Sequence, residues 1–265
     1  LPTIATQAEA EAGTNNTKMM TPLRVNQAIA SNVRMSGATV EINIDGQWVA
    51  FKRIIDVSSW GNVQQIVRSG WANDYFKTGD QLVSSYDGGT IVWEVIGIDV
   101  DTPSDSSFTH SMTIQTKDCI ENRVWDSGDD NRYINSDIRA YLNGSFLSKL
   151  DPELSVVIGQ VNKKVAVRDS IGGQDNFSDK VFLLSRKEVD LGDEGTNTGE
   201  FVYPFYNGKG NANRIKTLDG SPRYWWLRSP SVSTSNGVRR VGTDGSLSIS
   251  LARTTHGVSP ACVII

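Results

Sequence analysis

Asp-Gly steps at residues 45–46, 87–88 and 244–245 interrupt runs in which apolar and polar residues alternate, and these steps constrain the fold of the 265-residue chain strongly. Alternation with a period of two is typical of half-buried β-strands, and an Asp-Gly step between two such runs is typical of a tight hairpin turn. We therefore expect antiparallel hairpins over residues 38–57 and 81–100, and a turn between two late strands at residues 244–245.

Short amphipathic segments between these strands predict a few helices. Residues 5–12 are good helix formers that end before a glycine, and residues 21–33 begin with a Thr-Pro step that suits a helix start. Residues 60–78 predict a helix followed by an aromatic-rich turn. Residues 136–150 begin with a serine placed to cap a helix, and their Asn-Gly step is expected to end or kink it. The mixture of strands and short helices predicts an α+β fold.

Composition excludes some classes of protein. Hydrophobic residues make up 38% of the chain and charged residues 21%, and no apolar run approaches the length needed to span a membrane. The formal net charge of −4 argues against nucleic-acid binding. Residues 221–265 contain five arginines and one aspartate, a net charge of +4, so the rest of the chain carries −8. A basic C-terminal face on an acidic body suits an anionic ligand, although scattered solvated arginines would give the same count.

The sequence contains little that suggests a metal or a cofactor. Cys119 and Cys262 lie among apolar neighbours and are expected to be buried thiols, with a disulfide between them left open. No Cys-x-x-Cys or His-rich tract indicates zinc, and no cofactor is expected. The acidic loops at residues 126–137 and 190–200 lack the spacing of an EF-hand, and a structural calcium ion in either loop is kept as an option.

The C-terminal segment combines a large apolar anchor with many small polar side chains. Its anchor is expected at Tyr224, Trp225, Trp226 and Leu227. Further buried apolar positions are expected at intervals after it, at Val232, Val238, Val241, Leu247, Ala252, Val258, Ala261 and Val263. The residues between these positions have no evident core role and form the candidate ligand-binding surface: Ser231, Ser233, Thr234, Asn236, Gly237, Arg239, Arg240, Gly242, Thr243, Ser248, Ile249, Ser250, Leu251, Arg253, Thr254, Thr255 and His256. Adaptable binding surfaces are often built as polar loops on a rigid frame.

The N-terminal string ATQAEAEAGTNNTKMMTPLRVNQAI, residues 5–29, resembles a segment that recurs in bacteriophage tail fibres. The resemblance implies a virion fibre that is a homotrimer, with its distal end facing the bacterial host. The two short helices predicted in this region have narrow apolar faces, and such helices are usually stabilised against copies of themselves or a neighbouring domain.

A second resemblance covers residues 79–265. Five short strings occur in a fixed order: NSDIRAYLNGSF, KVFLLS, YWWLRSP, DGSL and GVSPACVI. Together they resemble a domain of phage and prophage proteins that has a C-type-lectin-like fold and is related to the formylglycine-generating-enzyme class. The resemblance implies kinship with the variable proteins of diversity-generating retroelements, in which chosen codons of the C-terminal segment are rewritten at adenines. Residues 231–265 lack Lys, Glu, Gln, Met and Trp, which that mechanism does not produce from asparagine codons.

Catalytic alternatives find less support in the sequence. Glycosidase chemistry needs two carboxylates across the scissile bond, and the acidic residues cluster in apparent loops, at Asp126, Asp129, Asp130, Asp190, Asp193 and Glu194. A catalytic triad needs a histidine, but His110 has no nucleophile elbow to serve and His256 falls within the candidate surface. Oxidase chemistry of the formylglycine-generating type needs a paired-cysteine site, which Cys262 in a terminal apolar strand does not indicate.

These observations predict three parts: a helical tail-fibre segment at residues 1–35, a hairpin and helix connector at 36–78, and a C-type-lectin-like domain at 79–265 with a variable segment at 224–265. We expect a non-enzymatic receptor-binding protein at the distal end of the fibre in the virion. Its expected partner is a protein or an anionic glycan on the bacterial surface, with no nucleic acid and no membrane insertion. A capsule- or glycan-degrading tail enzyme and a purely structural fibre cap are the alternatives.

Overall fold

The computed structural model describes residues 3–12, 18, 25, 28–29, 33–36, 39–44, 46–52, 57–168, 173–194 and 200–265. The chain divides into two compact units, residues 1–56 and 57–265. This boundary lies inside the predicted connector, so that the connector's hairpin belongs to the first unit and its helix to the second. The described part of the chain is mostly β-sheet with a few short helices, which confirms the α+β class, and none of its helices has the length and apolarity to cross a membrane.

The first unit begins with helix α1, Gln7–Ala12. The hydroxyl of Thr6 accepts a hydrogen bond from the backbone N–H of Glu9 (3.3 Å), and the Glu9 carboxylate accepts one from the backbone N–H of Thr6 (2.9 Å). This reciprocal pair is a capping box, which satisfies N–H groups that a helix start leaves free. Helix α1 thereby confirms the first predicted helix, whereas most of the second, at residues 21–33, lies outside the described residues.

A three-stranded antiparallel sheet completes the first unit, in the order β1-β2-β3. Its strands are β1 (Val33–Ser36), β2 (Thr39–Ile44) and β3 (Gln47–Lys52). Gly46 has φ +82°, a left-handed conformation that glycine adopts without strain, and its N–H donates to the side chain of Asn43 at 2.9 Å. The hairpin predicted at residues 38–57 is confirmed for β2 and β3, whereas residues 38, 45 and 53–56 lie outside the described residues.

The second unit contains a six-stranded sheet in the order β11-β18-β6-β5-β4, with β8 paired to β18. Its strands are β4 (Gln81–Tyr86), β5 (Gly89–Ile98), β6 (Met112–Thr116), β8 (Ile158–Gly159), β11 (Val181–Phe182) and β18 (Ala261–Ile264). The β4–β5 hairpin turns at Asp87 and Gly88, both with positive φ, as the sequence predicted. Strands β5, β6 and β18 form the core, where Trp93, Ile114 and Val263 are fully buried.

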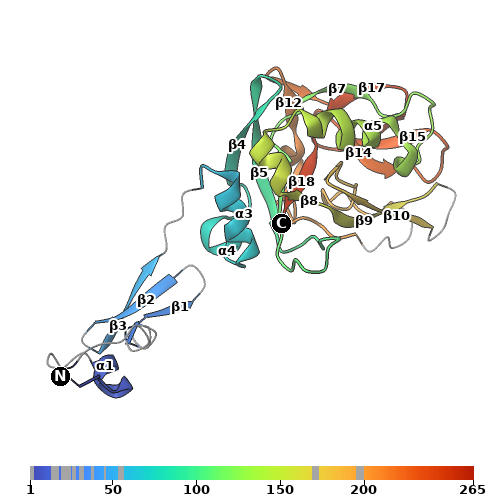
Figure 1. Ribbon diagram of the computed structural model, residues 1–265. Helices are drawn as coiled ribbons and strands as arrows, with labels where there is room; N and C mark the ends of the chain where they lie inside the picture. Colours follow the sequence, from blue (N-terminus) through green and yellow to red (C-terminus); the bar gives the residue numbers. More distant parts are fainter. Residues whose placement is uncertain are drawn as a thin grey trace. The chain divides into compact units, whose positions relative to one another are not determined.

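A five-stranded sheet follows, in the order β16-β15-β14-β17-β7. Its strands are β7 (Glu121–Val124), β14 (Trp225–Pro230), β15 (Gly237–Val241), β16 (Leu247–Leu251) and β17 (Thr255–Val258). Strands β14 and β17 are parallel, and the other neighbours are antiparallel. The late strands and the turn at residues 244–245 match the sequence prediction. Figure 1 shows β4 and β5 on one side of the unit and β14, β15 and β17 on the other.

Short helices and two small hairpins complete the second unit. They are α3 (Trp60–Arg68), α4 (Ala72–Tyr75), the 3-10 turn η1 (Tyr133–Asn135), α5 (Asp137–Tyr141), η2 (Leu142–Phe146), α6 (Pro152–Val157), the hairpin of β9 (Val161–Ala166) with β10 (Gln174–Asp179), η3 (Asn211–Arg214), and the hairpin of β12 (Lys216–Leu218) with β13 (Ser221–Arg223). Ser136 caps α5 as predicted, accepting from the N–H of Arg139. The helix does not end at Asn143 and Gly144 but widens there into the π-turn η2.

The two shortest connections between the large sheets run from β6 to β7 and from β17 to β18. In the second connection, the hydroxyl of Ser259 lies 3.0 Å from the amide nitrogen of Gln115 and donates to the carbonyl of Thr116 (3.1 Å). The hydroxyl of Tyr206 donates to the amide oxygen of Gln115 at 2.6 Å. Because β18 returns to the six-stranded sheet, the segment from β14 to β17 is held at both ends by buried strands.

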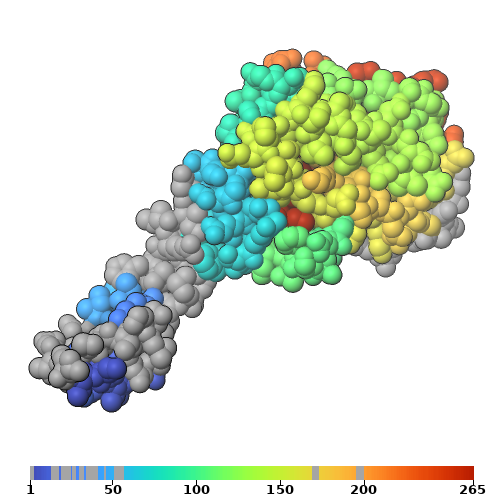
Figure 2. Space-filling model, in the orientation of Figure 1, coloured from blue at the N-terminus to red at the C-terminus, as the bar shows by residue number. Residues whose placement is uncertain are grey.

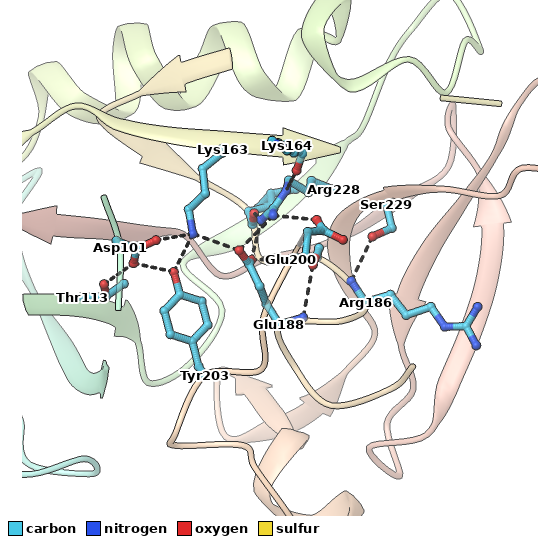
Figure 3. Close-up of polar contacts among 12 residues, drawn as sticks. Asp101, Thr113, Lys163, Lys164, Arg186, Glu188, Glu200, Tyr203, Arg228 and Ser229 are labelled. Carbon is cyan, nitrogen blue, oxygen red and sulfur yellow. Dashed lines mark hydrogen bonds and ion pairs between the residues drawn. The ribbon is translucent and has the colours of Figure 1, made fainter. Parts of the chain in front are cut away.

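A buried ionic network fixes the end of β14 (Figure 3). Arg228 is fully buried and donates to both carboxylate oxygens of Glu188 and to Glu200 (2.7 Å). Lys163 of β9 contacts Glu188 (2.9 Å) and Asp101 (2.5 Å) from the other side. Opposite charges at these distances hold the pKa of Glu188 well below its ordinary value although burial acts to raise it. The network joins β14 to β9 and to the loop before β12.

Candidate binding surface

Most of the candidate surface lies on β15, β16 and β17 of the five-stranded sheet. In the β15–β16 pair, Arg240 stands opposite Ser248 and Arg239 stands opposite Ile249. Successive residues of a strand point to opposite faces, so the two arginines lie on opposite faces of the sheet. Arg240 is also paired with Trp226 of β14 and shares its face. The candidate residues therefore form two groups on the two faces instead of one continuous surface.

Exposure separates the candidate residues from the apolar anchors. Exposed are Ser233, Thr234, Ile249, Leu251, Arg253 and Thr255, and half-buried are Asn236, Arg239, Arg240, Thr243, Ser248, Ser250, Thr254 and His256. The anchors Trp225, Trp226 and Leu227 are fully buried. Figure 2 shows orange and red surface of the C-terminal strands along the upper rim of the second unit. The structure thus presents most of the residues that the sequence assigned to a surface.

Three candidate residues are buried, which corrects their assignment: Ser231, Gly237 and Gly242. The N–H of Ser231 donates to the carbonyl of Gly237 at 2.7 Å and closes the turn between β14 and β15. A Cβ at Gly237 would lie 2.4 Å from the hydroxyl of Thr234, and one at Gly242 would lie 2.6 Å from the carboxylate of Asp244. These positions fix the backbone and do not offer side chains to a ligand.

The apolar anchor also needs correction. Tyr224 was expected to be buried with the two tryptophans, but it is 38% exposed. It precedes β14 and stands beside His256 with ring centroids 5.7 Å apart. Val232 and Leu247 are half-buried instead of buried, whereas the other predicted apolar positions are buried. Tyr224 therefore belongs to the exposed surface.

Two of the three arginines in the candidate surface already have carboxylate partners. Arg239 binds Glu194 with both ends of its guanidinium, at 2.5 and 2.8 Å. Glu194 also accepts from Arg186 at 2.9 Å, and these contacts hold the pKa of Glu194 below its ordinary value despite its partial burial. Arg253, which is mostly exposed, contacts Asp129 at 3.1 Å. Both arginines thus have a carboxylate partner within the protein, and Arg239 shares its partner with Arg186.

Arg240 has a different environment, which we call the Arg240 cluster and define as Tyr224, Trp226, Arg240, Ser248, Ser250 and His256. The guanidinium carbon of Arg240 lies 3.9 Å from the centroid of the Tyr224 ring. The ring of His256 meets the Trp226 ring edge-on at 4.6 Å. The hydroxyl of Ser248 lies 3.3 Å from Nε of Arg240, and that of Ser250 lies 3.1 Å from Nε2 of His256. The cluster joins strands β14 to β17 on one face of the sheet.

The contact between Arg240 and His256 determines the state of the imidazole. Nε2 of His256 lies 2.5 Å from a terminal nitrogen of the Arg240 guanidinium. A guanidinium can only donate hydrogen bonds, so Nε2 must accept and the imidazole carries its proton on Nδ1. Burial, together with the positive charge of Arg240, lowers the pKa of His256 from 6.5 to about 4. The cluster at neutral pH therefore contains one positive charge and a neutral imidazole.

Two scaffold side chains, Asn131 and Trp125, donate to backbone carbonyls of the C-terminal segment. The side-chain N–H₂ of Asn131 lies within 3.1 Å of three carbonyl oxygens of the β14–β15 turn, those of Ser231, Thr234 and Gly237. The indole of Trp125 donates to the carbonyl of Leu227 at 3.1 Å. These bonds position the turn and β14 without relying on the side chains of the candidate surface.

The acidic residues weighed for glycosidase chemistry all accept hydrogen bonds or ion pairs from protein groups. Asp126 and Asp130 accept backbone N–H groups within their own loop, and Asp190 accepts the N–H of Gly208. Asp129, Asp193 and Glu194 pair with basic side chains. In the described part of the chain, no three Asp, Glu, His or Cys side chains are grouped to hold a metal.

The remaining catalytic candidates are also engaged elsewhere. His110 contacts Asp99 at 3.2 Å and packs against Gly70. Cys119 and Cys262 are buried free thiols, so the disulfide left open by the sequence is not formed. Burial raises the pKa of both thiols, that of Cys119 to about 12, which disfavours the nucleophilic thiolate.

Sequence reasoning missed several residues of this region. The partners Glu194 and Asp129 are 45 and 124 residues away from the arginines that they bind, and no spacing rule connects them. Arg123 of β7 lies beside His256 in register, and its guanidinium stacks 3.6 Å from the ring of Tyr141. The alternation of β7 alone could not show that this strand joins the C-terminal sheet.

Comparison with known proteins adds a family but no activity. No curated protein and no solved structure matches the chain. Residues 109–265, which include the whole five-stranded sheet, match the model of a family described as a domain of unknown function, DUF6273. Because this match covers more than half of the 265 residues, the chain belongs to the DUF6273 family.

Proposed function

We propose that the protein is a phage receptor-binding protein at the distal end of a tail fibre, and that its five-stranded sheet binds a ligand on the bacterial surface. The observation that carries this proposal is the separation of the C-terminal segment into buried anchors and exposed polar residues. Trp225 and Trp226 are fully buried, whereas candidate residues such as Ser233 and Arg253 are exposed. A rigid frame with exposed polar positions is what an adaptable recognition surface requires.

The fold of residues 79–265 is proposed to be C-type-lectin-like. Its support is the return of β18 to the centre of the six-stranded sheet, which closes the segment from β14 to β17 into a supported unit. The bonds from Asn131 and Trp125 to backbone carbonyls support the further proposal that a retroelement rewrites the exposed side chains. Such bonds are unaffected when a side chain of the segment is replaced.

The N-terminal unit is proposed to place this domain on a homotrimeric fibre in the virion. Its support remains the sequence of residues 5–29 together with helix α1, which begins with a capping box. Three copies on one fibre would raise the avidity for a multivalent cell surface by about 10² to 10⁴ when several sites engage at once. A modest affinity at each surface is then sufficient for adsorption.

Binding of the full chain to bacterial cells tests the receptor-binding proposal. The labelled protein is mixed with a panel of bacteria of both envelope types. It is compared with two double substitutions of β16, one on each face of the sheet: Ile249→Glu with Leu251→Glu on the face of Arg239, and Ser248→Glu with Ser250→Glu on the face of Arg240. Val156→Glu, at a residue that is 78% exposed on α6, is the control. We expect cell binding that at least one double substitution reduces and the control retains. Binding that all variants share with the wild type, or that none shows, would contradict the proposal.

Deep sequencing of the gene in a population of the source phage tests diversification. Substitutions concentrated at exposed positions such as Ser233, Ser248 and Thr254, with Trp225 and Trp226 constant, are the expected result. Uniform low variation along the chain would remove the retroelement proposal and leave a fixed adhesin.

A further inference from the structure

The unusual feature of the Arg240 cluster is a half-buried arginine without a counter-charge. Arg228, Arg239 and Arg253 each contact a carboxylate, but within the described residues Arg240 contacts only an aromatic ring, a hydroxyl and an imidazole. Partial burial lowers the pKa of Arg240, because its charge loses hydration without gaining an acid. A half-buried charge is ordinarily paired, so this site is electrostatically incomplete.

We propose that Arg240, positioned by His256, is the oxyanion-binding centre of the recognition surface, and that the ligand is a surface glycopolymer carrying a carboxylate or a phosphodiester. This inference rests on the proposed receptor-binding function and names the ligand class of the same surface. A protein ligand is the alternative that protease treatment of the bacteria distinguishes from a glycopolymer.

The geometry of the guanidinium supports this assignment. Nε of Arg240 faces the hydroxyl of Ser248, and one terminal nitrogen, Nη1, faces His256. No described residue accepts a hydrogen bond from the other terminal nitrogen, Nη2. The end of the guanidinium fork is therefore available, and this is the edge with which arginine binds carboxylates and phosphates through charge-assisted bonds.

The surroundings of the charge favour an anion attached to a hydroxylated backbone. The hydroxyls of Ser248 and Ser250 flank the site, and either can donate to or accept from a polyol. Tyr224, 38% exposed, offers the uncovered part of its ring to an apolar sugar face. Trp226 is fully buried and supports His256 from below instead of contacting the ligand.

The neighbouring charges do not replace the missing anion. On β7, Arg123 lies in register with His256, and its Nε donates to Glu121 at 3.0 Å. Glu121 is thus engaged by its own strand neighbour. An oxyanion bound to Arg240 could also accept a hydrogen bond from Nε2 of His256 once that nitrogen is protonated. Ligand binding would then be accompanied by proton uptake on His256 as the pH falls toward the pKa of the imidazole.

Binding of the full chain to two immobilised polymers tests the proposal: poly(glycerol phosphate), which carries phosphodiesters, and polygalacturonate, which carries carboxylates. Arg240→Gln removes the charge, and Arg240→Lys keeps the charge but removes the fork. The matched control is Arg68→Gln on helix α3, because Arg68 also stacks on an aromatic ring, that of Phe108 at 4.7 Å, but is exposed. Near-UV circular dichroism verifies that each variant is folded.

We expect the wild type to bind at least one polymer, and the polymer that it binds identifies the source of the oxyanion. Arg240→Gln should lower that affinity about tenfold or more, since it removes charge-assisted hydrogen bonds. Arg240→Lys should show a smaller loss, and Arg68→Gln should bind as the wild type does. Equal losses for Arg240→Gln and Arg68→Gln would indicate general charge attraction and would overturn the proposal.

Cell binding separates this proposal from the proposed function. If the wild type binds bacterial cells but neither polymer, or if Arg240→Gln binds cells as strongly as the wild type, the oxyanion centre is wrong and receptor binding stands. Loss of cell binding after protease treatment of the bacteria would show a protein ligand and would also overturn the glycopolymer assignment. Failure of the wild type to bind any cell would remove both.

Discussion

Replacement of Arg228 by methionine should destabilise the second unit severely, because the guanidinium holds two buried carboxylates. Arg228 is fully buried and donates to both oxygens of Glu188, to Glu200 at 2.7 Å and to the carbonyl of Leu183 at 2.9 Å. Methionine has a similar length but no donors, so the substitution removes the bonds without leaving a large cavity.

The expected magnitude follows from what remains around the carboxylates. Glu188 keeps Lys163 at 2.9 Å and the backbone N–H of Ser185 at 2.9 Å. Removing one partner of a buried ion pair typically costs about 3–5 kcal/mol, because an uncompensated buried charge is left behind. Total stabilities of about 5–15 kcal/mol make this a large fraction. With a urea dependence of about 2 kcal/mol per molar, the unfolding midpoint should fall by about 2 M.

Urea unfolding followed by tryptophan fluorescence measures this loss, since Trp93, Trp125 and Trp225 are fully buried and report the second unit. Arg253→Met is the matched control, because it breaks an ion pair in which the arginine is 64% exposed. Exposed pairs contribute about 0–1 kcal/mol, so the control should unfold almost as the wild type does. A loss below about 1 kcal/mol for Arg228→Met, equal to that of the control, would refute the reasoning.

Three further outcomes are expected. Gly245→Ala should lower the melting temperature clearly more than Gly220→Ala. Both glycines have positive φ, but only at Gly245 would an added Cβ meet a backbone oxygen, that of Asn211, 1.9 Å away. Equal decreases in melting temperature would show that the backbone shifts to relieve this clash. Cys119 and Cys262 should not react with a thiol reagent until the protein is unfolded, because burial raises their pKa. The imidazole of His256 should titrate near pH 4 in the folded protein, as NMR can measure. Because the imidazole of the unfolded chain already takes up its proton near pH 6.5, the free energy of unfolding should fall as the pH drops from 6.5 to 4. A pKa near 6.5 in the folded protein would contradict the desolvated position of His256.

Local signals predicted the elements of the fold well. The Asp-Gly turns at residues 87–88 and 244–245 and the capping serine before α5 depend on neighbouring residues alone, and the structure places each of them as expected. The Asn143-Gly144 step did not end its helix, because the side chain of Asn143 accepts the N–H groups of Lys180 and Val181 and so ties the helix to β11. That contact joins residues nearly 40 positions apart and leaves no pattern in the sequence.

The candidate surface could be predicted only in part, for the same reason. The alternation of β15 and β16 shows which residues avoid the core, but it does not show that Arg239 and Arg240 lie on opposite faces with different partners. The parallel pairing of β14 with β17 brings Tyr224 beside His256, and a parallel neighbour cannot be inferred from turn signals. Tyr224 was therefore assigned to the apolar anchor, although it is exposed.

The ion pair of Arg239 bears on how much change the proposed surface could tolerate. If position 239 were rewritten, Glu194 would lose its bidentate partner, and a buried carboxylate without a partner is costly. Glu194 would keep Arg186 at 2.9 Å and the backbone N–H of Val232 at 3.2 Å, so its charge would remain compensated. Removal of Arg228 is costlier, because the fully buried Arg228 binds two carboxylates, Glu188 and Glu200, and the Lys163 that Glu188 would keep is shared with Asp101. The structure thus keeps indispensable charges on the buried end of β14 and places replaceable ones on β15, which is the arrangement that a surface open to substitution needs.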